Sequence, residues 1–385
     1  MGNFDGRTVV SKDKRGRSMS AGIERIAFYI STLQVGGAER AICNLANGFC
    51  EKGSKVYMVT ENPDGKESYP LHPDVERVML EAPKRGSRLH KAAARITILR
   101  RCVKELGVQI LVSFIGKANI RAVLATRFTS TKVIVSVRSA PAREYGTKVR
   151  RVLAKVLFRF AEGAVFQTEE ARDFFAPSVR KKAVVLMSPL HADFIRPRYD
   201  GERKHEVVTV GRLHKVKNHE MLIRSFAAVW PDYPDYVLKL YGDGEMKEKL
   251  TALIAELNMG QSVVLMGNCS HVADAIREAD IFVLSSDVEG MPNALLEAMA
   301  LGLACISTDC PCGGPRTVIR DGENGLLIPV GDTDALERAL RKVLSDAELK
   351  ERLGINAAQI QKELDPQRVD QMWMDYIAAR MKKNG

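Results

Sequence analysis

Residues 285–300 decide the fold, and they read Ser-Ser-Asp-Val-Glu-Gly-Met-Pro-Asn-Ala-Leu-Leu-Glu-Ala-Met-Ala. The apolar run before them, residues 281–284, is rich in branched side chains and predicts a buried strand. After them, Pro292 suits the first turn of a helix, and residues 294–301 are good helix formers. The stretch therefore predicts a strand, a loop that carries Glu289, and a helix with Glu297 about two turns in.

The predicted loop is suited to bind an anion. Free amides at a helix N-terminus carry partial positive charge, which stabilises a phosphate. Two carboxylates, one at the mouth of the loop and one along the helix, can bind the hydroxyls of a sugar and of a ribose. The alternative is an acidic surface loop beside a glutamate on a helix face.

Composition indicates a globular protein. The 385 residues suffice for two to three domains, with 45% hydrophobic and 27% charged residues. We expect no transmembrane helix, because no apolar run reaches about 18 residues, and no secretory signal, because residues 1–22 are polar. Seven scattered cysteines fit reduced thiols, and Cys310-Pro311-Cys312 lacks a second ligand pair at zinc spacing.

The net charge of +11 is unevenly spread, because residues 1–200 are strongly basic and the remainder is mildly acidic. A basic half suggests contact with a polyanion or an anionic membrane. Two basic stretches, 84–104 and 147–160, carry apolar residues at helical spacing. We expect these apolar stripes to dock on a sheet. A further hypothesis is that the charged outer faces bind anionic lipid, and each cation near the surface would then contribute about 1 kcal/mol to the binding free energy.

Strands and helices alternate along the chain, which predicts parallel sheets covered on both faces. We predict a flexible tail over residues 1–22, an N-terminal domain over 23–190 and a C-terminal domain over 204–365. A last helix, 366–383, completes the N-terminal domain. Residues 188 to about 203 contain Pro189 and Pro197 and lack periodicity, as an interdomain linker would.

Three further loops follow predicted strands. Gly36 and Gly37 stand between the first strand and a helix, where glycines either let a phosphate approach the backbone or simply form a tight turn. Arg212 and Lys217 follow the first strand of the second half. Residues 332–334 read Asp-Thr-Asp, a pattern that some transferases use for manganese, but a helix cap is the better interpretation there.

Glu289 and Glu297, set in Glu-Gly-Met-Pro-Asn-Ala-Leu-Leu-Glu, resemble the paired-glutamate motif of retaining nucleotide-sugar glycosyltransferases of family 4, which have the GT-B fold. Residues 35–40, Val-Gly-Gly-Ala-Glu-Arg, are similar to the first loop of the same enzymes. The resemblance covers about residues 25–380. It implies an α/β protein with two Rossmann-like domains that face each other across a cleft, and a last helix that crosses back to the first domain.

The resemblance also implies roles for individual residues. Glu289 would bind the sugar hydroxyls and Glu297 the ribose hydroxyls. The donor diphosphate would be neutralised by two cations and the amides of one turn, namely Arg212, Lys217, Gly290, Met291, Pro292 and Asn293. The loop at Gly267 and Asn268 would hold the base. Gly36, Gly37 and Arg138 would form the part of the site that binds phosphate and the acceptor. Arg138 stands where many relatives carry histidine.

The implied activity is retaining transfer of a hexose or N-acetylhexosamine from a nucleotide sugar, with UDP as the expected carrier, to a lipid-linked or polysaccharide acceptor. No metal or other cofactor is expected. The enzyme would be cytoplasmic and peripheral at the inner face of the membrane, held at the anionic surface by its basic half. Alternatives are a soluble acceptor or epimerisation of the nucleotide sugar. Nucleic-acid binding is disfavoured, because aromatic residues make up 6% of the chain and no such motif is present.

Overall fold

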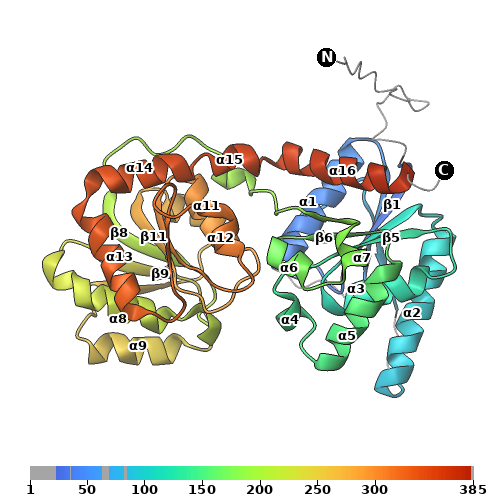
Figure 1. Cartoon of the computed structure of the whole chain (residues 1–385), viewed down its shortest axis with the longest axis horizontal. Coiled ribbons are helices and arrows are strands. Elements are labelled where there is room, and N and C mark those ends of the chain that lie inside the picture. The colour runs from blue at the N-terminus through green and yellow to red at the C-terminus, as the bar shows by residue number, and fades with distance from the viewer. Residues whose placement is uncertain (1–22, 35, 63–68, 82–84, 383–385) are drawn as a thin grey trace, which may run out of the picture. The chain divides into compact units, whose positions relative to one another are not determined.

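We describe the protein from a computed structural model over residues 23–34, 36–62, 69–81 and 85–382. The tail predicted for residues 1–22 lies outside the described residues. The chain forms two compact units (Figure 1). Unit 1 extends to Leu186 and takes in the residues from Gln367 onward, and unit 2 is Met187–Pro366.

Unit 1 contains a parallel sheet whose described strands follow the order β3-β2-β1-β4-β5-β6-β7. The strands are β1 (Arg25–Tyr29), β2 (Lys55–Thr60), β3 (Glu76–Met79), β4 (Ile110–Phe114), β5 (Lys132–Ser136), β6 (Gly163–Phe166) and β7 (Ala183–Val185). Phe28 of β1 pairs with Met58 of β2 on one side and Val112 of β4 on the other, so the strand order reverses between β1 and β4. The apolar runs at residues 26–30, 56–60, 110–114, 133–137, 164–167 and 183–186 predict six of these strands, and each agrees with the structure to within one residue at each end. Strand β3 was missed, because this half-exposed edge strand reads Glu-Arg-Val-Met and lacks an apolar run.

The helices of unit 1 include the last helix of the chain. They are α1 (Gly37–Glu51), α2 (Arg88–Glu105), α3 (Gly116–Thr126), α4 (Pro141–Glu144), α5 (Lys148–Leu157), α6 (Glu169–Asp173), α7 (Pro177–Arg180) and α16 (Pro366–Lys382). Trp373 of α16 is buried in the core shared by α1 and the sheet, and it stacks on Phe114 with ring centroids 5.8 Å apart. The Tyr376 hydroxyl accepts a hydrogen bond from the Ala164 amide at 2.9 Å. The return of this helix to the first domain is therefore confirmed.

Helix α5 does not pack as predicted. Its apolar residues Val149, Val152 and Val156 are 69%, 61% and 44% exposed, and its buried side chain is Ala154. The prediction that this stripe docks on the sheet is therefore wrong, and α5 instead lies against α3 with its apolar stripe exposed. Helix α2 follows the prediction at its C-terminal end, where Leu99 and Val103 are buried.

Unit 2 contains a second parallel sheet, with described strands in the order β10-β9-β8-β11-β12-β13. Its strands are β8 (Lys204–Val210), β9 (Val237–Tyr241), β10 (Val263–Gly267), β11 (Ala279–Leu284), β12 (Ala304–Thr308) and β13 (Leu326–Ile328). Its α-helices are α8 (His219–Val229), α9 (Lys247–Glu256), α10 (Val272–Ile276), α11 (Asn293–Ala300), α12 (Gly314–Val318), α13 (Thr333–Ser345), α14 (Ala347–Ala357) and α15 (Ile360–Glu363). The Asp332 side chain caps α13 by accepting the Ala335 amide at 2.8 Å, as predicted. None of the described helices is long and apolar enough to cross a membrane.

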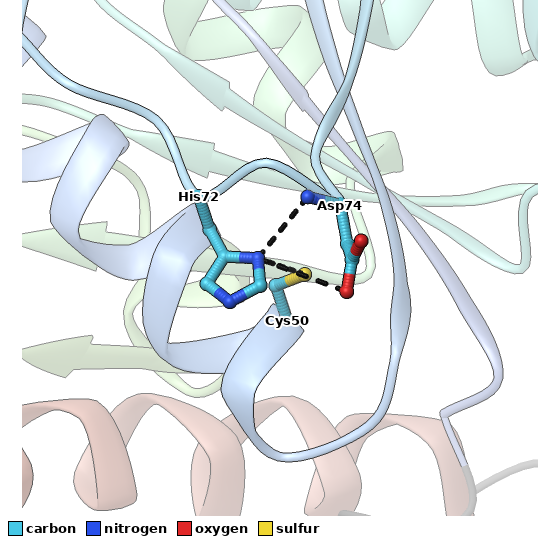
Figure 2. Close-up of side chains that lie close together, drawn as sticks. All are labelled: Cys50, His72 and Asp74. Atoms are coloured by element: carbon cyan, nitrogen blue, oxygen red, sulfur yellow. Dashed lines mark hydrogen bonds and ion pairs between the residues drawn. The ribbon is translucent and has the colours of Figure 1, made fainter.

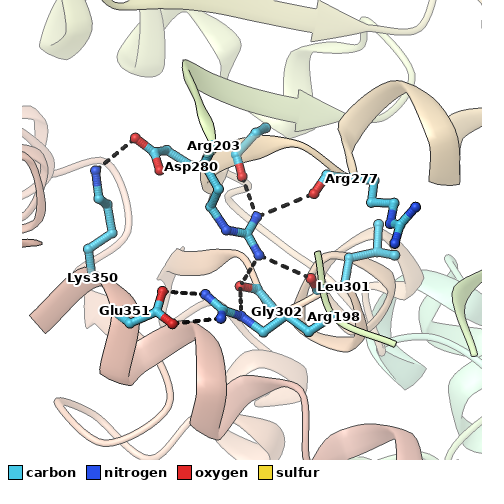
Figure 3. Close-up of polar contacts among 9 residues, drawn as sticks. Arg198, Arg203, Arg277, Asp280, Leu301, Gly302, Lys350 and Glu351 are labelled. Carbon is cyan, nitrogen blue, oxygen red and sulfur yellow. Dashed lines mark hydrogen bonds and ion pairs between the residues drawn. The ribbon is translucent and has the colours of Figure 1, made fainter. Parts of the chain in front are cut away.

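The segment that precedes β8 belongs to the body of unit 2. Figure 3 shows how two arginines attach it: the Arg203 guanidinium donates to the carbonyls of Ala279 at 2.6 Å and Gly302 at 3.0 Å, while Arg198 pairs with Glu351 of α14. Burial lowers the pKa of Arg203, and the carbonyl oxygens around it satisfy its donors. These contacts attach the predicted linker to unit 2 rather than leaving it independent.

Candidate functional site

The site residues of unit 2 lie where the strand order reverses. Strands β8 and β11 are parallel neighbours, so the loops that follow them meet at the carboxyl edge of the sheet, where open α/β sheets bind ligands. Two hydrogen bonds join these loops. The Asp287 amide donates to the Val216 carbonyl at 2.8 Å, and the Ser285 hydroxyl donates to the Lys217 carbonyl at 2.9 Å. The loops therefore form one structural unit.

Lys217 and Glu289 form an ion pair in this unit. Lys217 Nζ lies 2.6 Å from Glu289 Oε1, and the side chains are 22% and 14% exposed. The Ser286 hydroxyl donates to the same carboxylate oxygen at 2.7 Å. Both donors use Oε1, which leaves Oε2 without a donor among the described residues. The carboxylate is fixed in position while one of its oxygens can still accept a hydrogen bond from a ligand.

The backbone of Glu289 is held by the Cys310-Pro311-Cys312 segment. The Glu289 amide donates to the Pro311 carbonyl at 2.9 Å, and the Cys312 amide donates to the Glu289 carbonyl at 2.8 Å. Burial, followed by the nearby Glu289 charge, raises the pKa of Cys310 to about 11, so its thiol stays protonated. This pair of cysteines therefore has a structural explanation that requires no metal.

The turn before α11 offers several backbone donors. Among the described residues, no backbone acceptor is found for the amides of Gly290, Met291 and Asn293, and the Pro292 side chain provides no cap. Gly314 packs directly beneath this turn. A Cβ atom there would come within 1.9 Å of the Gly290 carbonyl oxygen, so the close approach requires glycine. The turn has the free amides that an anion site needs.

The other predicted donor residues are distributed along the same sheet. Glu297 is buried in α11, and as the fifth residue of that short helix it lies about one turn in, not two. Arg212 is exposed, and its side chain has no ion pair in the described part of the chain. Gly267 ends β10 with φ +70° and open space above it, and Asn268 follows. No contact joins these two residues to Glu289, because β9 separates β10 from β8.

The predicted residues of unit 1 lie at the carboxyl edge of its own sheet. Gly36 and Gly37 form the start of α1, where the Glu39 carboxylate folds back over Gly36 and burial raises the pKa of Glu39. Arg138 follows β5 and is buried, with its guanidinium carbon 5.1 Å from the ring centre of Phe114. Burial lowers the pKa of Arg138 to about 10, so it remains a cation at neutral pH.

Comparison with protein families identifies both halves of the chain. Residues 193–360 match the model described as glycosyl transferases group 1, and residues 36–191 match the glycosyl transferase 4-like domain. The chain belongs to the group 1 glycosyltransferases. Its resemblance to the family 4 enzymes is thus confirmed.

Two curated relatives of this glycosyltransferase come from Campylobacter jejuni. One is the GalNAc-α-(1→4)-GalNAc-α-(1→3)-diNAcBac-PP-undecaprenol α-1,4-N-acetyl-D-galactosaminyltransferase, 29% identical over 92% of this chain and 98% of the relative. The other is the N-acetylgalactosamine-N,N'-diacetylbacillosaminyl-diphospho-undecaprenol 4-α-N-acetylgalactosaminyltransferase, 26% identical over 92% of this chain and 100% of the relative.

Solved structures show the same fold. Sucrose-phosphate synthase from Thermosynechococcus elongatus superposes with a TM-score of 0.79 at 18% identity, covering 93% of this chain and 99% of that one. HepE from Anabaena, solved with UDP and glucose, has a TM-score of 0.77 at 16% identity and covers 92% of this chain and 100% of its own. The GT-B class is therefore confirmed.

Sequence reasoning missed a buried charge cluster in unit 1 of the glycosyltransferase. The Glu61 carboxylate, directly after β2, accepts hydrogen bonds from the hydroxyl of Tyr29 and from Arg121 of α3, and Arg95 of α2 lies 3.7 Å away. Burial and the Glu61 charge raise the pKa of Tyr29. A glutamate directly after an apolar strand was the available signal, but its partners come from helices distant in sequence.

Cys50, His72 and Asp74 also lie close together, and they form the one such metal-like grouping within the described ranges (Figure 2). Cys50 Sγ is 3.5 Å from His72 Nδ1, and this nitrogen accepts the Asp74 amide at 3.1 Å. His191 accepts the amide of Asp193 in the same local arrangement. A histidine turn with a neighbouring thiol explains the contacts, and we assign no metal to it.

Proposed function

We propose that this glycosyltransferase moves a hexose or N-acetylhexosamine from a UDP sugar to a lipid-linked or polysaccharide acceptor, with retention at the anomeric carbon. The observation that carries the proposal is the fixed Lys217–Glu289–Ser286 arrangement beside the free amides of the 290–293 turn. One site thereby combines a cation and backbone donors for a diphosphate with a carboxylate for sugar hydroxyls.

The chemistry follows from charge. When the glycosidic bond breaks, the leaving diphosphate gains negative charge, and fixed donors stabilise it without reorganisation. Lys217, Arg212 and the amides of the turn would supply these donors. Oε2 of Glu289 would accept a sugar hydroxyl, and Glu297 would accept the ribose hydroxyls. HepE was solved with UDP and glucose, which supports the choice of a UDP-linked donor.

Retention and independence from metal belong to the same proposal. In same-face attack, the acceptor hydroxyl replaces the diphosphate on the side from which it leaves, and a leaving phosphate oxygen takes the acceptor proton. Lys217 and Arg212 would provide the charge that a divalent ion provides elsewhere. We therefore expect full turnover in the presence of EDTA.

The acceptor is proposed from the relatives. Both Campylobacter jejuni enzymes are named for undecaprenol-linked glycans, and the present chain matches them over almost their whole length. A lipid-linked acceptor lies at a bilayer, so we propose that the enzyme works at the cytoplasmic face of the membrane as a peripheral protein. The excess of Lys and Arg in residues 1–200 would favour this anionic surface.

A donor screen tests the proposal. UDP, GDP and ADP sugars are compared by thermal shift and by hydrolysis, with the wild type and with Glu297→Gln. Glu348→Gln, which alters an exposed carboxylate on α14, is the matched control. We expect one UDP sugar to stabilise the wild type and the control, and the stabilisation to be lost in Glu297→Gln.

Other outcomes would contradict parts of the proposal. If no nucleotide sugar bound, the proposed transferase activity would be contradicted. If Glu297→Gln bound the donor as well as the wild type, Glu297 would not bind the ribose. Conversion of the donor sugar with no acceptor present would identify an epimerase. Transfer to soluble glycans but not to lipid-linked ones would show that the acceptor is a soluble glycan.

A further inference from the structure

Helix α5 of unit 1 carries an apolar stripe that faces solvent. The stripe consists of Val149, Val152, Leu153 and Val156, whose spacing of three and four residues places them on one helix face. Phe160, in the turn after the helix, extends it and is 49% exposed. Contiguous exposed apolar surface of this kind marks an interaction site in a soluble protein.

A second segment extends the stripe. Phe128, in the loop after α3, is 92% exposed, and the Arg127 guanidinium lies 4.9 Å from its ring and 4.2 Å from the ring of Phe160. Phe128 has φ +61°, a conformation that is unfavourable for a bulky side chain. Such local strain persists where the surroundings impose it, often at functional positions. The aromatic pair and its arginine form one end of the stripe.

The charges around the stripe indicate what covers it. Residues 147–160 contain five cations and no carboxylate. A second copy of the chain docked through this helix would bring ten cations of the two α5 segments together, with no carboxylate of α5 to pair with them. An anionic bilayer instead offers phosphates to the cations and an apolar interior to the valines, as basic amphipathic helices require.

We propose that α5, together with Phe128 and Phe160, inserts its apolar stripe into the headgroup region of an anionic bilayer. The proposal rests on the proposed function, since a lipid-linked acceptor brings the enzyme to a membrane. It reverses the expectation from the sequence: the apolar face of α5 contacts lipid, and the cations along its sides bind the headgroups.

Helix α5 is connected to the loops at the carboxyl edge of the unit 1 sheet. Helix α5 follows the loops at the carboxyl end of β5, and the Glu144 carboxylate of α4 accepts the amides of Gly116, Arg138 and Ser139 at 2.7–3.0 Å. The start of α5 is thereby connected to the loop after β5, which carries Arg138 of the predicted acceptor side, and to the loop after β4. Insertion of α5 would hold that edge of unit 1 at the depth of the headgroups, where the diphosphate of a lipid-linked acceptor lies.

Vesicle flotation of the full chain tests the proposal. Phosphatidylcholine vesicles with about 30% phosphatidylglycerol are compared with phosphatidylcholine alone, because the anionic leaflet supplies the electrostatic attraction. We expect binding to the anionic vesicles and a partition coefficient about 100-fold lower for Val152→Asp/Val156→Asp, because two apolar side chains no longer enter the bilayer. The control is Ile355→Asp in α14 of unit 2, at a residue that is 46% exposed, and it should bind like the wild type.

Three results would overturn this assignment: a wild type that does not float, a double variant that floats like the wild type, or a wild-type dimer that the double variant dissociates. Turnover separates this proposal from the proposed function. With an acceptor on a short, water-soluble prenyl chain, the double variant should match the wild type, and with a vesicle-embedded long-chain acceptor it should be slower. A wild type that floats but uses neither acceptor contradicts the proposed function and leaves the membrane contact supported.

Discussion

Replacing Lys217 and Arg212 in turn distinguishes a cation that stabilises the fold from one that is available only to a ligand. Lys217 is paired with Glu289 at 2.6 Å in a mostly buried setting, whereas Arg212 is exposed. Breaking a fully buried pair costs about 3–5 kcal/mol and an exposed pair about 0–1 kcal/mol. Because the two side chains are 22% and 14% exposed, we expect Lys217→Met to lower the free energy of unfolding of unit 2 by about 2 kcal/mol. Arg212→Met should change it by less than about 0.5 kcal/mol.

Both replacements should slow transfer, since each removes a proposed donor to the leaving diphosphate, and we expect kcat to fall by about 100-fold in each. The chain has two tryptophans, Trp230 in unit 2 and Trp373 in unit 1. Urea unfolding followed by tryptophan fluorescence in a Trp373→Phe background therefore reports on unit 2.

Specific outcomes would refute this reasoning. An unchanged urea midpoint for Lys217→Met would show that the ion pair contributes nothing to stability. A destabilised Lys217→Met with normal kcat would limit Lys217 to positioning Glu289. A destabilised Arg212→Met would mean that its exposed side chain has a structural role.

Three further predictions concern single residues. Ser286→Ala should lower kcat about tenfold with little change in KM for the donor, because it removes one of two donors that orient Glu289; wild-type kinetics would contradict this. Burial, followed by the Lys217 charge, lowers the pKa of His219 to about 4. The free energy of unfolding should therefore fall, by up to about 3 kcal/mol, as the pH decreases from about 6.5 to 4, since the unfolded state binds the proton first. Urea titrations of His219→Gln should show no such dependence on pH. If the wild type and the variant lost stability in parallel as the pH fell, His219 would not be its source. Trp373→Ala should destabilise unit 1 by about 3–5 kcal/mol in thermal unfolding, and a smaller loss would mean that α16 is dispensable to that core.

Much of the fold could be predicted from the sequence because parallel strands buried on both faces appear as apolar runs. Residues 110–114 were predicted with the bounds of β4, and the last helix, predicted over residues 366–383, begins at the residue where α16 begins. The edge strand β3 was missed for the same reason, since it is half exposed. Glu297 lies about one turn into the helix and not two, because Pro292 is extended and the helix begins only at Asn293.

The sequence by itself determined which residues stand at the ends of strands, because strand and loop are encoded locally in apolar runs, glycines and prolines. It placed Lys217 and Glu289 in loops after strands, and the resemblance to the glycosyltransferase family made them candidate site residues. Only the tertiary structure decided that these two side chains bond to each other, that Ser286 shares the same carboxylate oxygen, and that the apolar face of α5 points to solvent. Periodicity shows that a helix has an apolar face, but the direction of that face depends on how neighbouring helices pack, and no local pattern encodes this.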